Sequence, residues 1–169
     1  NLLSNIGYLG VGVFLFFMIN DRFQKPLDIV LKNKNKPLTG LSFINMSTNQ
    51  TDSLAAYKNK AVIINVWATW CGPCRRELPD LEELQAKYGK DKLTVLAVSD
   101  EEEGVLKNYM DEKKLKLIVG KYFNHPMIDS LSSRPVSILI DPEGNIKDVV
   151  AGARGYNFFN NWVKEYIKL

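Results

Sequence analysis

The stretch AVIINVWATWCGPC, from Ala61 to Cys74, decides the fold class of this chain. Its first seven residues are almost continuously apolar and mostly β-branched, which is typical of a strand covered on both faces of a sheet. The two cysteines of the chain, Cys71 and Cys74, follow where this strand is expected to give way to a helix. Two cysteines at such a place are a redox couple, half of a metal site, or two unrelated core residues.

Apolar periodicity predicts the elements that follow the cysteines. A helix is expected to run as far as Gly89, because apolar and aromatic residues recur at helical spacing, at Leu78, Leu81, Leu84 and Tyr88. The run LTVLAV at 93–98 predicts a second buried strand. A strand, a helix and a strand in this order are typical of a parallel βαβ unit.

The second half of the chain predicts an antiparallel addition to this unit. Asp100 is expected to cap the next helix, with Glu103 as its reciprocal partner. The strands predicted at 136–141 and 146–152 flank a turn rich in Pro, Gly and Asn, and therefore predict a hairpin. An amphipathic helix is expected at 158–167. The predicted fold class is α/β, with one central mixed sheet and helices on both of its faces.

The first twenty residues differ from the rest because they contain no charge. Leu2–Ile19 is mostly apolar, and at about 1.5 Å per residue a helix of this length just crosses a hydrocarbon layer of about 30 Å. We expect a membrane anchor helix at 1–20, with a signal-peptide remnant and a buried helix as alternatives. The polar, lysine-rich segment 21–40 predicts a tether, which leaves 41–169 for one domain.

The charge of the chain argues against nucleic acid as a partner. The chain has 22 basic and 19 acidic residues and a formal net charge of +3. No basic run is interleaved with aromatic residues, as nucleic-acid-binding surfaces usually require. The charged residues are therefore interpreted as a solvated surface.

The position of Cys71 favours chemistry over packing. The free N–H groups and the dipole at the start of a helix stabilise negative charge, and the thiolate is the reactive form of cysteine. Pro73 suits the first helical turn, where its missing N–H costs nothing. Gly72 leaves the approach to the sulfur open, and Cys74 lies one turn along, within reach of a disulfide.

Three rival interpretations of the cysteine pair fit less well. Zinc usually takes four ligands, and the chain adds only His125 to its two cysteines, so no metal site within one chain is expected; a site shared between two chains stays open. A purely structural disulfide would close too short a loop to restrain the unfolded chain. Peroxiredoxins carry Thr or Ser three residues before their peroxidatic cysteine, and Ala68 holds that position here.

The cysteine motif resembles a known family. WATWCGPC, the strand before it and Pro79 are similar to the active site of a thioredoxin fold. CGPCRRELP, the apolar N-terminal segment and RPVSILIDPEGN resemble the TlpA/ResA-like thiol–disulfide oxidoreductases, which are tethered to bacterial membranes. The resemblance covers roughly residues 40–169 and implies a thioredoxin-like fold preceded by the hydrophobic helix.

The resemblance also implies roles for single residues. Cys71 is expected to be the attacking thiol and Cys74 the resolving thiol. Pro135 matches the cis-proline that packs beside the disulfide and helps to hold an extended substrate, although it also fits the start of an edge strand. Arg134 precedes it, where the family more often has a small or β-branched residue. Substrate contacts are further expected at the segment 70–73, from Trp70, Gly72 and Pro73.

Glu77 is the expected proton acceptor for Cys74. Thioredoxins proper bury an Asp six residues before the first cysteine, where this chain has Asn65, which takes no proton at neutral pH. The ResA-like pattern instead places a glutamate three residues after the second cysteine, and Glu77 fits it. The i, i+3 spacing puts the two side chains near one helix face. The alternative is a solvated glutamate in the first turn.

These features predict dithiol–disulfide exchange that reduces protein disulfides and needs no cofactor. The resemblance implies a protein substrate, a membrane-borne electron donor, and a role in cytochrome c maturation or redox homeostasis. The anchor implies a single-pass protein of the cell membrane with its catalytic domain outside the cytoplasm. A non-catalytic thioredoxin-like binding module and a thiol-dependent peroxidase are the alternatives.

Overall fold

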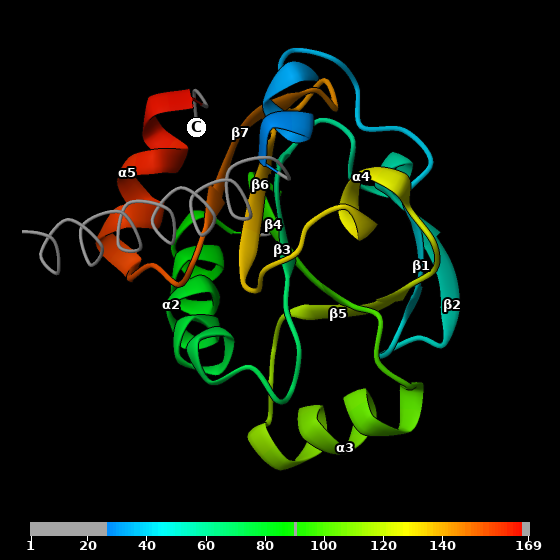
Figure 1. The fold of residues 1–169 in the computed structure, drawn as a ribbon. Helices are drawn as coiled ribbons and strands as arrows, with labels where there is room; N and C mark the ends of the chain where they lie inside the picture. The colour runs from blue at the N-terminus through cyan, green and yellow to red at the C-terminus, as the bar shows by residue number, and fades with distance from the viewer. Residues whose placement is uncertain (1–26, 90, 167–169) are drawn as a thin grey trace, which may run out of the picture.

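The computed structural model describes residues 27–89 and 91–166 of the chain. Within these residues seven strands form one mixed sheet in the order β2-β1-β5-β4-β3-β6-β7 (Figure 1). The strands are β1 (Ser42–Asn45), β2 (Gln50–Ser53), β3 (Ala61–Val66), β4 (Leu93–Ser99), β5 (Ile118–Tyr122), β6 (Val136–Ile140) and β7 (Ile146–Ala151).

The centre of the sheet follows the predicted pattern. β3 and β4 pair in parallel, and β6 pairs antiparallel with β3, with Val66 opposite Val136. β7 returns beside β6 as the predicted hairpin. The strands β5, β1 and β2 extend the other edge, and β5 escaped prediction because Gly120 and Lys121 interrupt its apolar pattern.

Helices cover both faces of the sheet, as predicted. The labelled helices are α2 (Gly72–Tyr88), α3 (Glu103–Lys113), α4 (Pro126–Asp129) and α5 (Tyr156–Tyr166), with a 3-10 turn η1 (Leu54–Tyr57), and residues 27–32 are also helical. Alternate residues of β3 serve two cores: Ile63 packs with the residues of α2, α3 and α5, whereas Ile64 packs with those of η1 and α4. Figure 1 shows α2 and α5 together on one side of β3 and β6, with α4 on the other.

The described part of the predicted tether, residues 27–40, is packed against the domain instead of being a free linker. Val30 is fully buried and Leu38 is nearly so. The backbone of this segment bonds to the β6–β7 hairpin, with the Asn35 N–H donating to Ile146 O at 2.7 Å and the Leu38 N–H to Gly144 O at 3.1 Å. The buried side chains of Val30 and Leu38, together with these backbone hydrogen bonds, therefore hold the lysine-rich segment against the domain.

The predicted anchor at 1–20 lies outside the described residues. Among the helices that the structure does describe, none has both the length and the apolar character needed to cross a membrane.

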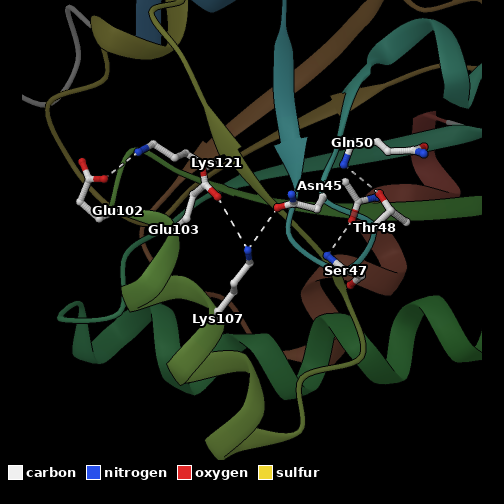
Figure 2. Close-up of polar contacts among 9 residues, drawn as sticks. Asn45, Ser47, Thr48, Gln50, Glu102, Glu103, Lys107 and Lys121 are labelled. Atoms are coloured by element: carbon white, nitrogen blue, oxygen red, sulfur yellow. Dashed lines mark hydrogen bonds and ion pairs between the residues drawn. The ribbon is translucent and has the colours of Figure 1, made fainter.

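Exposed polar contacts replace the predicted cap of α3 (Figure 2). The N-cap position is Glu102, which makes no side-chain cap bond, so the predicted pairing of Asp100 with Glu103 is wrong. Glu102 instead lies 3.1 Å from Lys121 of β5, and Glu103 lies 3.8 Å from Lys107, which also donates to the β1–β2 turn. The carboxylates of Glu102 and Glu103 thus pair with lysine side chains.

Candidate functional site

The cysteine pair lies where β3 leads into α2. Cys71 is the N-cap residue of α2, and Cys74 follows in its first turn, as the sequence predicts. The two form a disulfide with an S–S distance of 2.00 Å and a Cα–Cα distance of 5.3 Å. The Cys71 sulfur also accepts the N–H of Cys74 at 3.2 Å. The amide donors at the helix start are therefore directed at this sulfur.

The sulfur atoms are largely shielded, and access is from the side of Cys71. Cys71 is 5% exposed and Cys74 is fully buried, while Gly72 is half-buried and Pro73 is exposed. Of the two residues, Cys71 is therefore the one that keeps contact with solvent.

The two tryptophans before the cysteines have opposite environments. Trp67 is fully buried and packs on Tyr109 of α3, with ring centroids 5.2 Å apart. Trp70 is 70% exposed, the highest value among the exposed large apolar side chains of the described residues. This exposed indole directly before Cys71 leaves an apolar surface next to the disulfide in the chain.

Glu101, which the sequence analysis did not single out, holds the loop before Cys71. Its carboxylate accepts the Thr69 N–H at 2.7 Å and the Thr69 hydroxyl at 2.6 Å, and also the hydroxyl of Ser99 at 3.1 Å. Thr69 and Glu101 are 32 residues apart, so no local pattern could have indicated the contact. Bonds to a charged acceptor are stronger than neutral ones and fix this loop to the end of β4.

Pro135 lies directly before β6, at the end of the sheet where β3 ends. The Arg134–Pro135 peptide bond is cis, and the next residue, Val136, pairs with Val66. The guanidinium of Arg134 binds Asp100 at 2.8 Å, which explains why Asp100 does not cap α3. Asp100 and Glu101 therefore hold the segment before Pro135 and the loop before Cys71.

Glu77 is buried in the interior, so the alternative of a solvated glutamate is wrong. Its side chain is 2% exposed and lies on the same buried face of α2 as Cys74. One carboxylate oxygen accepts the side-chain amide of Asn65 at 2.8 Å, and the other accepts the backbone N–H of Arg154 at 3.1 Å. The Asn65 amide also donates to Ser137 of β6 at 3.0 Å. Residues from three segments thus enclose the carboxyl group, and Ser137 holds the Asn65 amide in place.

Burial raises the pKa of Glu77 to about 7. The hydrogen bonds from Asn65 and Arg154 lower the pKa, but they offset only part of the cost of removing the charge from water. A carboxyl group with this pKa is partly protonated at neutral pH and exchanges its proton readily. It is therefore suited to take a proton from its neighbour on α2.

Curated relatives match the central part of the chain. The chain is 35% identical over 106 residues to the thiol-disulfide oxidoreductase ResA of Oceanobacillus iheyensis, which is 61% of this chain and 55% of that protein. It is 36% identical over 112 residues to the thioredoxin-like protein YneN of Bacillus subtilis, which is 62% of this chain and 64% of that protein. The chain thus spans less than two thirds of the length of these relatives.

Solved structures and a family model agree with this match. A thiol:disulfide interchange protein of the thioredoxin family from Chlorobium tepidum TLS has a TM-score of 0.64 at 29% identity, over 78% of this chain and 97% of that one. A DsbF homologue from Corynebacterium diphtheriae, at 23% identity, shares the fold with a TM-score of 0.68, over 77% of this chain and 86% of that one. Because the model of the AhpC/TSA family matches residues 39–149, well over half of the chain, the chain belongs to this thioredoxin-like family.

Proposed function

We propose that the chain is a thiol–disulfide oxidoreductase that reduces protein disulfides by exchange at Cys71 and Cys74. The observation that carries the proposal is the Cys71–Cys74 disulfide at the start of α2, with the buried Glu77 one turn further along. The names of the relatives ResA and YneN support the same chemistry.

The exchange proceeds in two balanced steps. In the reduced protein the Cys71 thiolate attacks one sulfur of the substrate disulfide, forms a mixed disulfide and releases the other substrate sulfur as a thiolate. Cys74 then gives its proton to Glu77 and attacks the Cys71 sulfur, and the second substrate thiolate leaves. Two electrons have passed to the substrate, and the Cys71–Cys74 disulfide remains. An external dithiol must reduce it for the next turnover.

The surroundings of Cys71 supply the contacts for a polypeptide substrate. Trp70 offers an exposed apolar face, and Gly72 and Pro73 leave the first turn of α2 open. Arg134 and Pro135 lie directly before β6, at the end of the sheet where β3 ends. We assign substrate binding to these five residues.

The location of the reaction is part of the proposal. The apolar segment 1–20 anchors the chain in the cell membrane, and the domain works outside the cytoplasm, where disulfides persist. A membrane-borne dithiol protein then supplies the electrons. Cytochrome c maturation or general redox homeostasis is the process in which such a reductase acts.

A trapping experiment tests the proposed function. The reduced Cys74→Ser variant is mixed with a disulfide-containing peptide, and intact mass spectrometry follows the product. We expect one mixed disulfide per chain, because the resolving thiol is missing, whereas the Cys71→Ser variant should form none. Equal trapping by both variants, or none by either, would contradict the exchange. Peroxide consumption with a dithiol donor, measured in parallel, tests the peroxidase alternative.

A further inference from the structure

Arginine is distributed unevenly over the described residues. All four arginines in this part of the chain line one of two hollows, the first of which includes Gly72 and the second the segment 133–134: Arg75, Arg76, Arg134 and Arg154. Lysines are far more numerous, yet Lys113 is the sole described lysine that lines either hollow. The guanidinium groups thus line two hollows that include residues to which substrate binding is assigned, Gly72 in the first and Arg134 in the second.

The first hollow begins at Gly72, between the two cysteines. It has a volume of about 450 Å³ and is lined by Arg75, Arg76 and Lys113, with Glu82 as the sole carboxylate among its described lining residues. Glu82 already accepts the backbone N–H of Lys116. Positive charge therefore prevails in this hollow.

The second hollow lies beside the segment that precedes Pro135. It has a volume of about 470 Å³, and its described lining includes Arg134 and Arg154 but no carboxylate. The Arg134 guanidinium uses Nη2 to bind Asp100, while its buried Nε has no partner among the described residues. One carboxylate therefore does not saturate this guanidinium.

Stability of the fold does not account for this arrangement. Arg75, Arg76 and Arg154 are exposed and form no ion pair with a described residue. The Arg154 guanidinium donates to the adjacent Ala153 carbonyl and lies over the Phe158 ring, which leaves its charge without a carboxylate partner among the described residues. Even an exposed pair typically contributes less than about 1 kcal/mol. The planar guanidinium is instead well suited to bind a carboxylate of a partner with two parallel hydrogen bonds.

We propose that the protein whose disulfide is reduced presents carboxylates next to that disulfide, and that Arg75, Arg76, Arg134 and Arg154 hold it by them. The inference rests on the proposed exchange and names the class of its substrate, an acidic polypeptide segment. Complementary charge of this kind raises the rate of encounter by about 10-fold to 1,000-fold at low ionic strength.

Two disulfide peptides test the inference. They have the same length and differ only in carrying Glu or Lys on both sides of the cystine, and the full chain is used in its reduced form. We expect the second-order rate constant to be at least about tenfold higher for the Glu peptide at low ionic strength, and the ratio to fall as salt is added. A ratio of one, with an uncharged small disulfide still reduced, would overturn the inference and leave the exchange intact. If no disulfide were reduced, the proposed function would fail, and this inference with it.

Paired variants assign the effect to the arginines. The ratio of the two rate constants within one variant is the measured quantity, because it does not depend on how much of the preparation is folded. We expect R75Q/R76Q and R134Q/R154Q each to lower the ratio several-fold. The control K58Q/K92Q removes two charges from the other end of β3 and β4 and should keep the wild-type ratio. An unchanged ratio in the variant lacking all four arginines would overturn the assignment.

Discussion

At the scale of single residues, Glu77 shows how enclosure changes the chemistry of an ordinary carboxyl group. Three groups surround it: the helix α2 that carries it, the Asn65 amide and the Arg154 backbone. Its hydrogen bonds stabilise the charged form, yet burial is the larger effect and raises the pKa to about 7. A carboxyl group with this pKa can hold or release a proton at neutral pH, as the proposed exchange requires.

The stability of the protein should depend on Glu77 and pH. The pKa rises from 4.5 in the unfolded chain to about 7 in the fold, so the folded state binds more protons between these values. The stabilisation is complete below about pH 4.5 and is lost as the pH rises through 7, with a total of about 3 kcal/mol. In urea unfolding of the oxidised protein, Glu77→Gln should remove this loss. A variant with the wild-type pH dependence would contradict the assignment.

The second step of the exchange should also depend on Glu77. In Glu77→Gln the proton of Cys74 has no acceptor, so we expect resolution of a preformed mixed disulfide to slow by about 100-fold or more near pH 7. The wild-type rate should change around pH 7, and the variant should lack that inflection. Glu83→Gln, at an exposed position of α2, is the matched control and should behave as wild type. Equal rates in all three proteins would remove Glu77 from the mechanism.

At the scale of elements, the acidic residues that follow β4 position the site. Asp100 binds the guanidinium before Pro135, and Glu101 binds the loop before Cys71. The segment before Pro135 and the loop before Cys71 thus share one support at the end of β4. The helix α2 fixes Cys71 from the other side through its first turn.

Glu101→Gln should loosen the loop that carries Trp70. The amide has one acceptor oxygen in place of a charged carboxylate with two, so at least one of the Thr69 bonds is lost or weakened. We expect a loss of about 1–3 kcal/mol in the free energy of unfolding. The control Glu103→Gln affects a carboxylate whose only ion-pair partner among the described residues is Lys107, at 3.8 Å, and it should cost less than about 0.5 kcal/mol. Equal losses of unfolding free energy in the two variants would show that Glu101 does not stabilise the loop more than an exposed glutamate does.

The pairing of β1 with β5 requires Gly120. A Cβ at this position would lie 2.5 Å from the ring of Phe43, which is fully buried. Gly120→Ala should therefore destabilise the fold by roughly 1–3 kcal/mol. Gly104→Ala, in α3 with nothing within 4 Å of the new Cβ, should be neutral or stabilise by up to about 1 kcal/mol. Thermal melting of both variants measures the contrast, and a Gly120→Ala protein as stable as wild type would disprove the close contact.

At the scale of the whole molecule, the folding unit begins before residue 41. The segment 27–40 adds Val30 and Leu38 to the core that α4 and η1 cover. It also bonds to the β6–β7 hairpin, close to the end of the sheet. The residues that link the domain to the predicted anchor at 1–20 are thus fewer than the sequence suggested.

Adjacent apolar residues of this segment should differ in their effect on stability. Val30 is fully buried, whereas Ile29 is 41% exposed. We expect Val30→Ala to cost roughly 1–2 kcal/mol and Ile29→Ala less than about 1 kcal/mol, measured by urea unfolding. If both substitutions had the same small effect, the segment would not belong to the folding unit.

The sequence by itself determined the central elements and the place of the chemistry. Continuous apolar runs predicted β3 and β4, apolar residues at a period of 3.6 predicted α2, and a turn rich in Pro, Gly and Asn predicted the β6–β7 hairpin. Each of these patterns lies within one stretch of the sequence, because the burial of a local face is encoded by neighbouring residues. The spacing of Cys71 and Cys74 and the start of a helix predicted the disulfide site in the same way. These features need only neighbours along the chain.

The tertiary structure alone decided what surrounds that site. Glu77 is hydrogen-bonded to Asn65 and to Arg154, which lie 12 and 77 residues away in the sequence. Thr69 is hydrogen-bonded to Glu101, which lies 32 residues away. Such pairs depend on the register between strands and on loops that meet at one edge of the sheet, which no local pattern records. The pKa of Glu77 follows from that enclosure, since the same residue on a solvated turn would remain an ordinary acid.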